Sequence, residues 1–405
     1  MTLPVIVVGA GPVGLTVADI LSMQGTPVIV LEKSASLSKE WRASTFHSAT
    51  MELLEPSGIA DELMKLGLVA DKVQYRDRTT GLFAEFDCNV IADETKYPFR
   101  LQCPQSTYVR LVNDRLQTRE GVEIRYRCEV VRLEQDQHGV TVTLKTPDGQ
   151  EQIRAELVLG ADGARSTVRK ELGFKFEGYT LEQRFLLVGT PVDFRKYIPD
   201  LSYVNYIADP EEFLFILRVP EAWRFLYPVP ADLSEEVALD PDRIQRQLQK
   251  ALHTTDHFPI IERMIYRVHQ RVSEKFYDDR VILLGDAAHV NSPMGGLGLN
   301  SGIHDAVDLS RRLIRVFAGD GDLHDELETY SKVRREVALA YVRQITERNT
   351  SVLTEQDAQK RLQLQAELAA EANDPVRAKQ WLLRATLISS VREQGIGERP
   401  PAVRS

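Results

Sequence analysis

The residues with the most evident chemical potential are three glycines near the N-terminus, in the pattern Gly9-x-Gly11-x-x-Gly14. They stand between an apolar, β-branched segment and an amphipathic one, which predict a strand and a helix. In that context glycines permit a tight turn and a close backbone approach to a pyrophosphate, which the helix N-terminus holds. Residues 28–31 predict a second strand, and Glu32 at its end can accept hydrogen bonds from ribose hydroxyls. Because this acid disfavours a 2′-phosphate, the segment predicts a site for FAD or NAD rather than NADP.

Two further acid–glycine pairs, Asp162-Gly163 and Gly285-Asp286, each follow an apolar segment with the character of a buried strand. In open α/β sheets, ligands bind beyond the carboxyl ends of the strands. We therefore expect both carboxylates to face an extended ligand at the same sheet edge. For Asp162 the alternative is a plain strand–turn–helix with Ser166 as the N-cap.

A glycine-rich turn over residues 295–300 follows the second pair and precedes a helix expected to begin near Ser301. Glycines let backbone N–H groups approach a flat ring, and the helix dipole favours negative charge there by about 0.3–1 kcal/mol. A reduced flavin is an anion on its pyrimidine side, whereas an oxidised nicotinamide is not. The turn therefore favours FAD over NAD.

These motifs together resemble those of the single-component FAD-dependent aromatic hydroxylases, the para-hydroxybenzoate hydroxylase family. The residues that carry the resemblance lie at 9–14, 42–43, 52–54, 162–169 and 285–289. The resemblance spans residues 4–315 and is only general over 180–275, where alternating aromatic segments predict a mostly antiparallel sheet.

The resemblance implies an α/β fold: a Rossmann-like FAD-binding domain, an inserted, mostly antiparallel β-sheet substrate domain, and a C-terminal helical region. We expect the FAD-binding domain at 1–73, 98–179 and 275–349, the substrate domain at 74–97 and 180–274, and a helical segment with a tail at 350–405. The C-terminal helices can dock on their own FAD-binding domain or on a second subunit, so both monomer and homodimer remain open.

The resemblance also implies roles along the cofactor. Glu32 would hold the adenosine ribose, Asp162 would touch both FAD and the incoming nicotinamide, and Asp286 would hold the ribityl chain. Arg42 and Gln105 would lie along the pyrophosphate and ribityl region. The expected cofactor-binding residues are Gly9, Gly11, Pro12, Val13, Gly14, Glu32, Lys33, Arg42, Ala43, Gln105, Asp162, Gly163, Asp286, Pro293, Gly295, Gly296, Gly298, Leu299 and Asn300.

The implied reaction is a monooxygenation of a small phenol- or pyridinol-type ring, with or without a carboxylate. NADH or NADPH, bound transiently, would reduce FAD, and O2 would then form a C4a-hydroperoxide that attacks the ring. A base near the substrate would help, and His47 is the candidate catalytic residue because of its titration range. The alternative is a histidine at a helix start, bonded to backbone. We interpret His289 as structural and expect His304 on a helix surface, with a position facing the pocket as the alternative.

Candidate substrate residues lie on the expected sheet, which we expect to face the FAD-binding domain, and on the loop beside the flavin. An arginine there can pair with a carboxylate bidentately. For each residue, a role in packing or at the surface is the alternative. The candidates are Tyr203, Tyr206, Arg218, Arg224, Tyr227, Pro293 and Met294.

Composition excludes several function classes for this chain of 405 residues. The formal net charge is −9 without a basic block, which argues against nucleic acid or an anionic membrane as the main partner. Residues 3–21 lack the positive start of a signal peptide, and no apolar run reaches a membrane span of ~18 residues, so we expect a cytoplasmic protein. The three cysteines show no C-x-x-C spacing, which predicts reduced thiols without a metal site or disulfide framework.

Competing interpretations remain within and beyond flavoenzymes. A halogenase or an FAD reductase can share the fold, but the halogenase motif Trp-x-Trp-x-Ile-Pro is absent because Trp41, Trp223 and Trp381 are isolated. A plain NAD-dependent dehydrogenase would leave Gly285-Asp286 unexplained. A non-enzymatic FAD-binding regulator is the remaining alternative.

Overall fold

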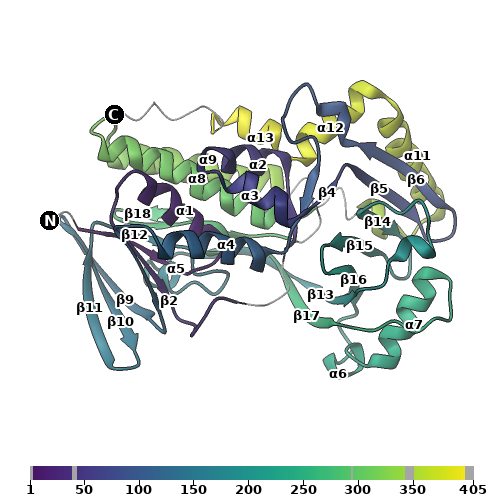
Figure 1. The fold of residues 1–405 in the computed structure, drawn as a ribbon, viewed down its shortest axis with the longest axis horizontal. Helices are drawn as coiled ribbons and strands as arrows, with labels where there is room; N and C mark the ends of the chain where they lie inside the picture. Colours follow the sequence, from purple (N-terminus) through teal and green to yellow (C-terminus); the bar gives the residue numbers. More distant parts are fainter. Residues whose placement is uncertain (1–2, 39–42, 293–294, 343–350, 397–405) are drawn as a thin grey trace.

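The computed structural model describes residues 3–38, 43–292, 295–342 and 351–396. A parallel sheet occupies one half of the molecule, and a larger antiparallel sheet extends away from it (Figure 1). Among the described residues, no helix combines the length and apolarity that a membrane crossing requires.

The first sheet has six strands in the order β18-β19-β12-β1-β2-β8. All neighbours are parallel except the edge pair β18/β19. Helix α1 (Pro12–Met23) connects β1 to β2, so the predicted strand–turn–helix–strand unit is confirmed. The four residues of β1 are all buried, as expected for a central strand covered on both faces. The strands are β1 (Val5–Val8), β2 (Val28–Glu32), β8 (Val122–Tyr126), β12 (Leu157–Gly160), β18 (Tyr277–Asp278) and β19 (Val281–Leu283).

A separate three-stranded antiparallel meander lies in sequence between β8 and β12 of this sheet. Its strands are β9 (Glu129–Asp136), β10 (Gly139–Thr146) and β11 (Gly149–Ala155). Its turns lie where His138-Gly139 and Pro147-Asp148-Gly149 predict them. The apolar alternation from 122 to 133 suggests one meander strand, but the structure divides it into two strands of different sheets. Residues Val122–Tyr126 pair in parallel with β2, and Arg127, with a positive φ of 56°, separates them from β9.

The large sheet has eight strands in the order β20-β17-β13-β16-β15-β14-β5-β6. All neighbours are antiparallel except β14 and β5, which confirms a mostly antiparallel sheet. Helix α7 (Pro241–Leu252) covers one face, and the main core shared with the parallel sheet covers the other. The strands are β5 (Lys72–Asp77), β6 (Gly81–Asp87), β13 (Phe176–Thr190), β14 (Val204–Ala208), β15 (Leu214–Val219), β16 (Ala222–Val229), β17 (Glu262–Ser273) and β20 (His289–Val290).

A small antiparallel sheet, β3-β7-β4, contributes to the same main core as both larger sheets. It consists of β3 (Thr45–Phe46), β4 (Leu68–Ala70) and β7 (Arg100–Gln102). Residues 49–66 have helical periodicity with a predicted break at Pro56-Ser57-Gly58; the structure confirms both, and Gly58 takes the left-handed conformation at the break. The other helices and 3₁₀ turns before α8 are α2 (Ser48–Leu54), η1 (Glu55–Ser57), α3 (Ile59–Leu66), η2 (Cys88–Ile91), α4 (Gln105–Gln117), α5 (Thr167–Glu171), η3 (Phe194–Lys196), α6 (Glu235–Ala238) and η4 (Gly285–Ala287).

The C-terminal helices dock on their own chain. Trp381 stacks on Phe86 of β6 with ring centroids 3.8 Å apart, and Lys379 pairs with Asp93 at 2.6 Å. Figure 1 shows two of these helices, α11 (Ala358–Asn373) and α12 (Pro375–Ala385), in yellow beside β5 and β6. The helices therefore dock within the chain, but these contacts lie in the segment 74–97 expected to belong to the substrate domain rather than in the expected FAD-binding segments. The helices are α8 (Leu297–Phe317), α9 (Leu323–Glu336), the π-helix η5 (Val337–Val342), α11 (Ala358–Asn373), α12 (Pro375–Ala385) and α13 (Ile388–Glu393).

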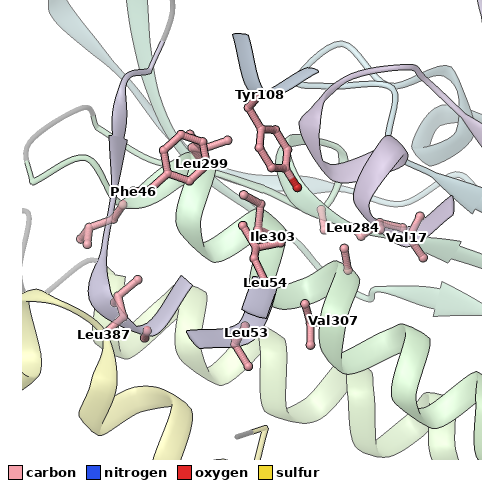
Figure 2. Packing of buried hydrophobic residues seen from close by; sticks show 14 of the residues in the cluster. Val17, Phe46, Leu53, Leu54, Tyr108, Leu284, Leu299, Ile303, Val307 and Leu387 are labelled. Carbon is pink, nitrogen blue, oxygen red and sulfur yellow. The ribbon is translucent and has the colours of Figure 1, made fainter. Parts of the chain in front are cut away.

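The centre of the main core joins segments that are far apart in sequence (Figure 2). Val17 of α1, Phe46 of β3 and Ile303 of α8 are all fully buried in it. The three cysteines are free, and all are buried. Because one core includes the glycine turn, the small sheet and α8, the motifs that these elements carry are held together.

Candidate active site

The first glycine turn is shaped by its neighbours and leaves one position open. Gly9 has a φ of +107°, and a Cβ there would lie 2.5 Å from the Ala161 carbonyl oxygen. A Cβ on Gly14 would collide with the Gly9 carbonyl, but a Cβ on Gly11 would meet nothing within 4 Å. Packing of the chain therefore requires the first and third glycines, while the second leaves room for a ligand. This open cradle fits a pyrophosphate above the N-terminus of α1.

Val13 joins the first motif to the third. Pro12 is the first residue of α1, a position that suits its fixed φ, and Val13 follows it. Gly285, at a φ of +59°, lies so close to Val13 that a Cβ would approach a Val13 methyl group to 2.8 Å. A Cβ on Gly302 of α8 would come within 2.6 Å of the same side chain. The motifs near residues 9 and 285 are therefore in direct contact.

Glu32 is held at the end of β2 beside the glycine turn. Its carboxylate accepts hydrogen bonds from the backbone N–H of Ala10 at 3.0 Å and of Ser34 at 2.8 Å. Lys33 is exposed. Further along the cofactor path expected from the sequence, the backbone N–H of Gln105 donates to the Ala43 carbonyl at 2.9 Å, which places these two expected residues side by side. Arg42, Pro293 and Met294 lie outside the described residues.

One carboxylate oxygen of Asp162 accepts backbone hydrogen bonds, and the other is available to a ligand. Its Oδ2 accepts from the N–H groups of Thr167 at 2.6 Å and Val168 at 3.2 Å, while Oδ1 is buried without a hydrogen-bond partner. Gly163 follows with a φ of +81°. The N-cap interpretation of Ser166 is confirmed as well, because its hydroxyl accepts from the Arg169 N–H at 2.9 Å. The orphaned oxygen is what a ligand hydroxyl or amide would satisfy.

The third motif rests on a buried ion network. Asp305 accepts from the Gly285 N–H at 2.9 Å and from His289 Nε2 at 2.8 Å, and Arg334 donates to it at 2.6 Å. Burial alone would raise the pKa of Asp305, but His289 and Arg334 outweigh it and lower the pKa to about 2. The structural role predicted for His289 is confirmed, and Asp286 itself lies exposed in η4.

The glycine-rich turn leads into α8 earlier than the sequence predicts. The helix begins at Leu297 rather than near Ser301, because Gly296 takes the left-handed conformation (φ +68°) at the N-cap. Leu299 and Asn300 therefore belong to the first turn, where backbone N–H groups are available to a ligand. A Cβ on Gly298 would meet Asn291 at 3.2 Å, so this glycine serves packing.

The side chain of Asn300 is committed to the protein. Its Oδ1 accepts from the His47 N–H at 2.8 Å and from the Thr50 hydroxyl at 2.7 Å. Its Nδ2 donates to the carbonyls of Thr45 at 2.8 Å and Gly296 at 2.6 Å. Asn300 thus fastens the glycine-rich turn to the β3–α2 segment, and only its backbone remains for the expected contact with a cofactor.

His47 is fully buried at the N-cap of α2. Its Nε2 lies 2.9 Å from the Gly295 carbonyl oxygen; because a carbonyl only accepts, Nε2 carries the proton. The Nδ1 atom is then an unprotonated acceptor, and it is buried without a partner. Burial, and then the positive charge of Arg100, hold the pKa of His47 well below its usual range, so the ring is neutral at pH 7. The helix-start interpretation accounts for one ring nitrogen, and the other is available to a substrate.

His304 is buried, which corrects the expectation of a surface position. Residues 299–310 of α8 are all buried because the small sheet, α2, α1 and α9 surround this helix. His304 Nε2 lies 2.8 Å from the Thr50 hydroxyl oxygen. Since Thr50 gives its own proton to Asn300, His304 is the donor in this contact. Burial, together with the charge of Arg334, lowers the pKa of His304 to about 3.

The candidate substrate residues divide between the two faces of the large sheet. Tyr227 packs against α7, and its hydroxyl donates to the Gln247 carbonyl at 3.2 Å. Arg218 pairs in register with Trp223 of that same face, and its guanidinium lies 5.9 Å from the Trp223 ring centroid. The expectation that all five residues face the FAD-binding part is therefore wrong for Tyr227 and Arg218. Alternation along β16 separates Tyr227 from Arg224.

The other candidates lie differently. Tyr206 and Arg224 are buried on the face that joins the main core, and burial lowers the pKa of Arg224 to about 10. Tyr203 is half-buried just before β14, with its ring centroid 6.1 Å from that of Trp223. Tyr206 accepts a hydrogen bond from Arg100 at 3.2 Å, which connects the large sheet to the small one.

Sequence reasoning missed Arg100 and Gln102. Both are almost fully buried polar residues of β7, on either side of Leu101. No spacing motif marks them. The only sequence signal is the alternation Arg-Leu-Gln, which in a strand directs the two polar side chains to one face.

The FAD binding domain family matches residues 2–345 of the chain. The chain is 34% identical over 383 residues to the para-nitrophenol 4-monooxygenase of Pseudomonas sp. (strain WBC-3), across 94% of each sequence. It is 32% identical to the 6-hydroxy-3-succinoylpyridine 3-monooxygenase of Pseudomonas putida (strain DSM 28022 / S16), across 82% of this chain and 84% of that one. The crystal structure of p-nitrophenol 4-monooxygenase from Pseudomonas putida DLL-E4 matches with a TM-score of 0.91 at 31% identity, over 98% of this chain and 99% of that one.

Proposed function

The chain belongs to the FAD binding domain family, among its aromatic monooxygenases, and on this basis we propose that it hydroxylates a phenol- or pyridinol-type ring with NAD(P)H and O2. In the balanced reaction, the ring C–H becomes C–OH with one oxygen atom of O2. The other oxygen leaves as water, and NAD(P)H with one proton is oxidised to NAD(P)+. The two relatives named above support this ring class, because one is named for a nitrophenol and the other for a hydroxylated pyridine.

The observation that carries the proposal is the meeting of three cofactor motifs, at 9–14, 162–169 and 285–289, in one place. Val13 contacts Gly285, and Arg169 donates to the Ala287 carbonyl at 2.6 Å. These contacts bring the first and second motifs against the third. The open cradle at Gly11 and the orphaned Oδ1 of Asp162 both fit an extended dinucleotide.

Each part of FAD has residues suited to hold it. The pyrophosphate would lie against Gly11 and the start of α1, and the adenosine ribose beside Glu32. Asp162 and Asp286 would bind the polar linker, and the N-terminal turn of α8 would bind the flavin ring. Bound FAD supplies the electron transfer from NAD(P)H and the activation of O2, which side chains cannot supply by themselves.

We assign His47 as the residue that accepts the proton of the ring hydroxyl. Its Nδ1 is an acceptor without a partner, and Nε2 anchors the ring to Gly295. An electron-rich phenolate reacts more readily with an electrophilic oxygen than the phenol does. Because burial disfavours a charged His47, the residue would share or pass on the proton rather than store it.

The first experiment tests the class of reaction. Purified protein is expected to bind FAD, to oxidise NAD(P)H faster with a suitable phenol or pyridinol, and to give a product that carries one oxygen atom from isotopically labelled O2. Protein without affinity for FAD would refute the proposal. Oxidation of NAD(P)H that no ring compound accelerates or oxygenates would instead indicate a reductase on this fold.

A second experiment tests His47. His47→Gln keeps a donor for Gly295 and removes the ring acceptor, and His47→Ala removes both. We expect hydroxylation of a phenol that is neutral at the assay pH to fall by roughly 10²–10⁴-fold. A phenol that is already ionised at that pH should lose much less, since it has no proton to give. Equal losses with both phenols, at unchanged FAD affinity, would contradict the role.

A further inference from the structure

The small sheet presents a polar face inside the protein. The antiparallel register pairs Thr45 with Gln102 and Phe46 with Leu101, so Thr45 and Gln102 share one face. Arg100 is two residues from Gln102 in β7 and lies on that face as well. The same register, extended by one residue, sets His47 opposite Arg100, whose charge adds to the effect of burial in lowering the pKa of His47. Only 3% of Arg100 and none of Gln102 is exposed.

Three polar atoms on this face have no hydrogen-bond partner although all are buried: Arg100 Nε, Gln102 Nε2 and His47 Nδ1. The side chains that carry them are held in place by other contacts. Gln102 Oε1 accepts from the Thr45 hydroxyl at 3.1 Å, and an Arg100 Nη atom donates to the Tyr206 hydroxyl at 3.2 Å. Two donors and one acceptor are thus fixed in position, and none of them is satisfied.

Arg100 is also a buried cation without a counter-charge. Among the described residues no carboxylate lies within ion-pair distance of it. Its neighbours are the aromatic residues Tyr206 and Tyr75 and the thiol of Cys88, whose pKa burial raises to about 12. An isolated buried charge is strongly unfavourable unless something of opposite charge binds to it. The environment of Arg100 therefore favours an anion.

The array also indicates which anion. A carboxylate would satisfy both donors, but it has no proton to offer the His47 acceptor. A ring hydroxyl matches all three atoms, because its oxygen accepts from Arg100 and Gln102 while its proton goes to His47. We propose that Arg100 and Gln102 bind the substrate's hydroxyl oxygen and stabilise it as the phenolate or pyridinolate. This inference rests on the proposed function, and it makes an ionisable ring hydroxyl the feature that the enzyme recognises.

The test measures the ionisation of a bound phenol on the FAD-loaded protein. A nitrophenol is suitable as the probe because its ionised form is coloured, so its binding and its pKa can be read from one spectral titration. We expect wild-type protein to lower the pKa of the bound probe below that of the free probe. Arg100→Met should abolish that shift and weaken binding roughly 10- to 100-fold, and Arg100→Lys should keep part of both. Gln102→Leu should give a smaller loss.

The control is Arg218→Met, which removes an arginine from the opposite face of the large sheet and should leave binding unchanged. FAD affinity should be equal in all variants, and the unfolding temperature of substrate-free Arg100→Met should equal or exceed that of wild type, since an unpaired buried charge is removed. A probe bound by Arg100→Met with wild-type affinity and pKa would overturn the inference. So would a loss of FAD binding with unchanged binding of the probe, because Arg100 would then serve the cofactor.

Two outcomes separate this inference from the function on which it rests. Wild-type protein that binds FAD but neither binds nor oxygenates any phenol or pyridinol would refute the proposed function. Wild-type protein that oxygenates a phenol but binds it without a pKa shift would refute only the inference. If Arg100→Met does not fold, the wild-type titration and Arg100→Lys still decide the question.

Discussion

The buried His304 predicts a specific dependence of stability on pH. Its pKa is about 3 in the folded protein and 6.5 ordinarily, because burial penalises the charged ring. The unfolded chain therefore binds a proton below pH 6.5 that the folded protein does not bind. A depressed pKa of this kind contributes full stability above pH 6.5 and progressively less as the pH falls toward 3.

The size of the effect follows from the width of that window. Each pH unit within it costs about 1.4 kcal/mol. Of the interval from pH 7 to pH 5, about 1.5 pH units lie below 6.5, so His304 alone should lower the unfolding free energy by about 2 kcal/mol. Across the whole window the loss should reach about 5 kcal/mol.

The assay is urea unfolding of wild-type and His304→Gln protein at pH 7 and pH 5, with saturating FAD. Glutamine keeps a donor for the Thr50 hydroxyl and cannot titrate. We expect the variant to lose about 2 kcal/mol less than wild type between the two pH values. Contributions from His47 and the carboxyl groups are common to both proteins and cancel in this difference.

The control replaces His324 of α9, whose side chain is 71% exposed, by glutamine. This variant should follow the wild-type dependence on pH, since it leaves the buried His304 unchanged. An identical dependence in wild type and His304→Gln would refute the reasoning. It would mean that His304 takes up its proton in the folded protein, and thus that this stretch of α8 is accessible to water.

Three further predictions concern the glycine turn, the ion network and the outer face of the large sheet. Gly11→Ala should fold normally but bind FAD more weakly in a spectral titration. Gly14→Ala should instead lower the unfolding temperature, because its Cβ collides with the Gly9 carbonyl. Equal unfolding temperatures of the two variants would contradict this distinction. Asp305→Asn leaves Arg334 buried without its anion and should cost about 3–5 kcal/mol in urea unfolding, and a loss below 1 kcal/mol would show that the network matters little. Tyr227→Phe should leave KM for the aromatic substrate unchanged and cost about 1 kcal/mol of stability, because it loses only the hydrogen bond to Gln247. A raised KM in steady-state assays would show instead that Tyr227 contacts the substrate.

The nucleotide-binding unit could be predicted from the sequence because its signals are local. Glycines 9 and 14, the apolar strand before them and Glu32 after the second strand lie within one short segment, and steric limits on backbone decide their conformation. The acid–glycine pairs were predictable for a related reason. A parallel sheet collects the carboxyl ends of its strands at one edge, whatever the distance between them in sequence.

Which face a side chain occupies was less predictable. The sequence predicts that Arg224 and Tyr227 both face the FAD-binding domain, but residues three apart in a strand lie on opposite faces, and α7 covers the face of Tyr227. For His304 the sequence predicts a helix surface, but the small sheet, α1, α2 and α9 pack around α8 and bury this residue. Such outcomes depend on contacts between residues hundreds of positions apart, which a local pattern does not contain.

The sequence by itself therefore determined the cofactor class and the chain segments that would hold it, since glycine conformations and strand ends are local properties. The tertiary structure alone decided what surrounds the substrate. It set His47 opposite Arg100 through the pairing of β3 with β7, and it left the polar atoms of that face unsatisfied. The physical reason is that a buried charge acquires a function only from the groups that surround it, and folding determines those groups.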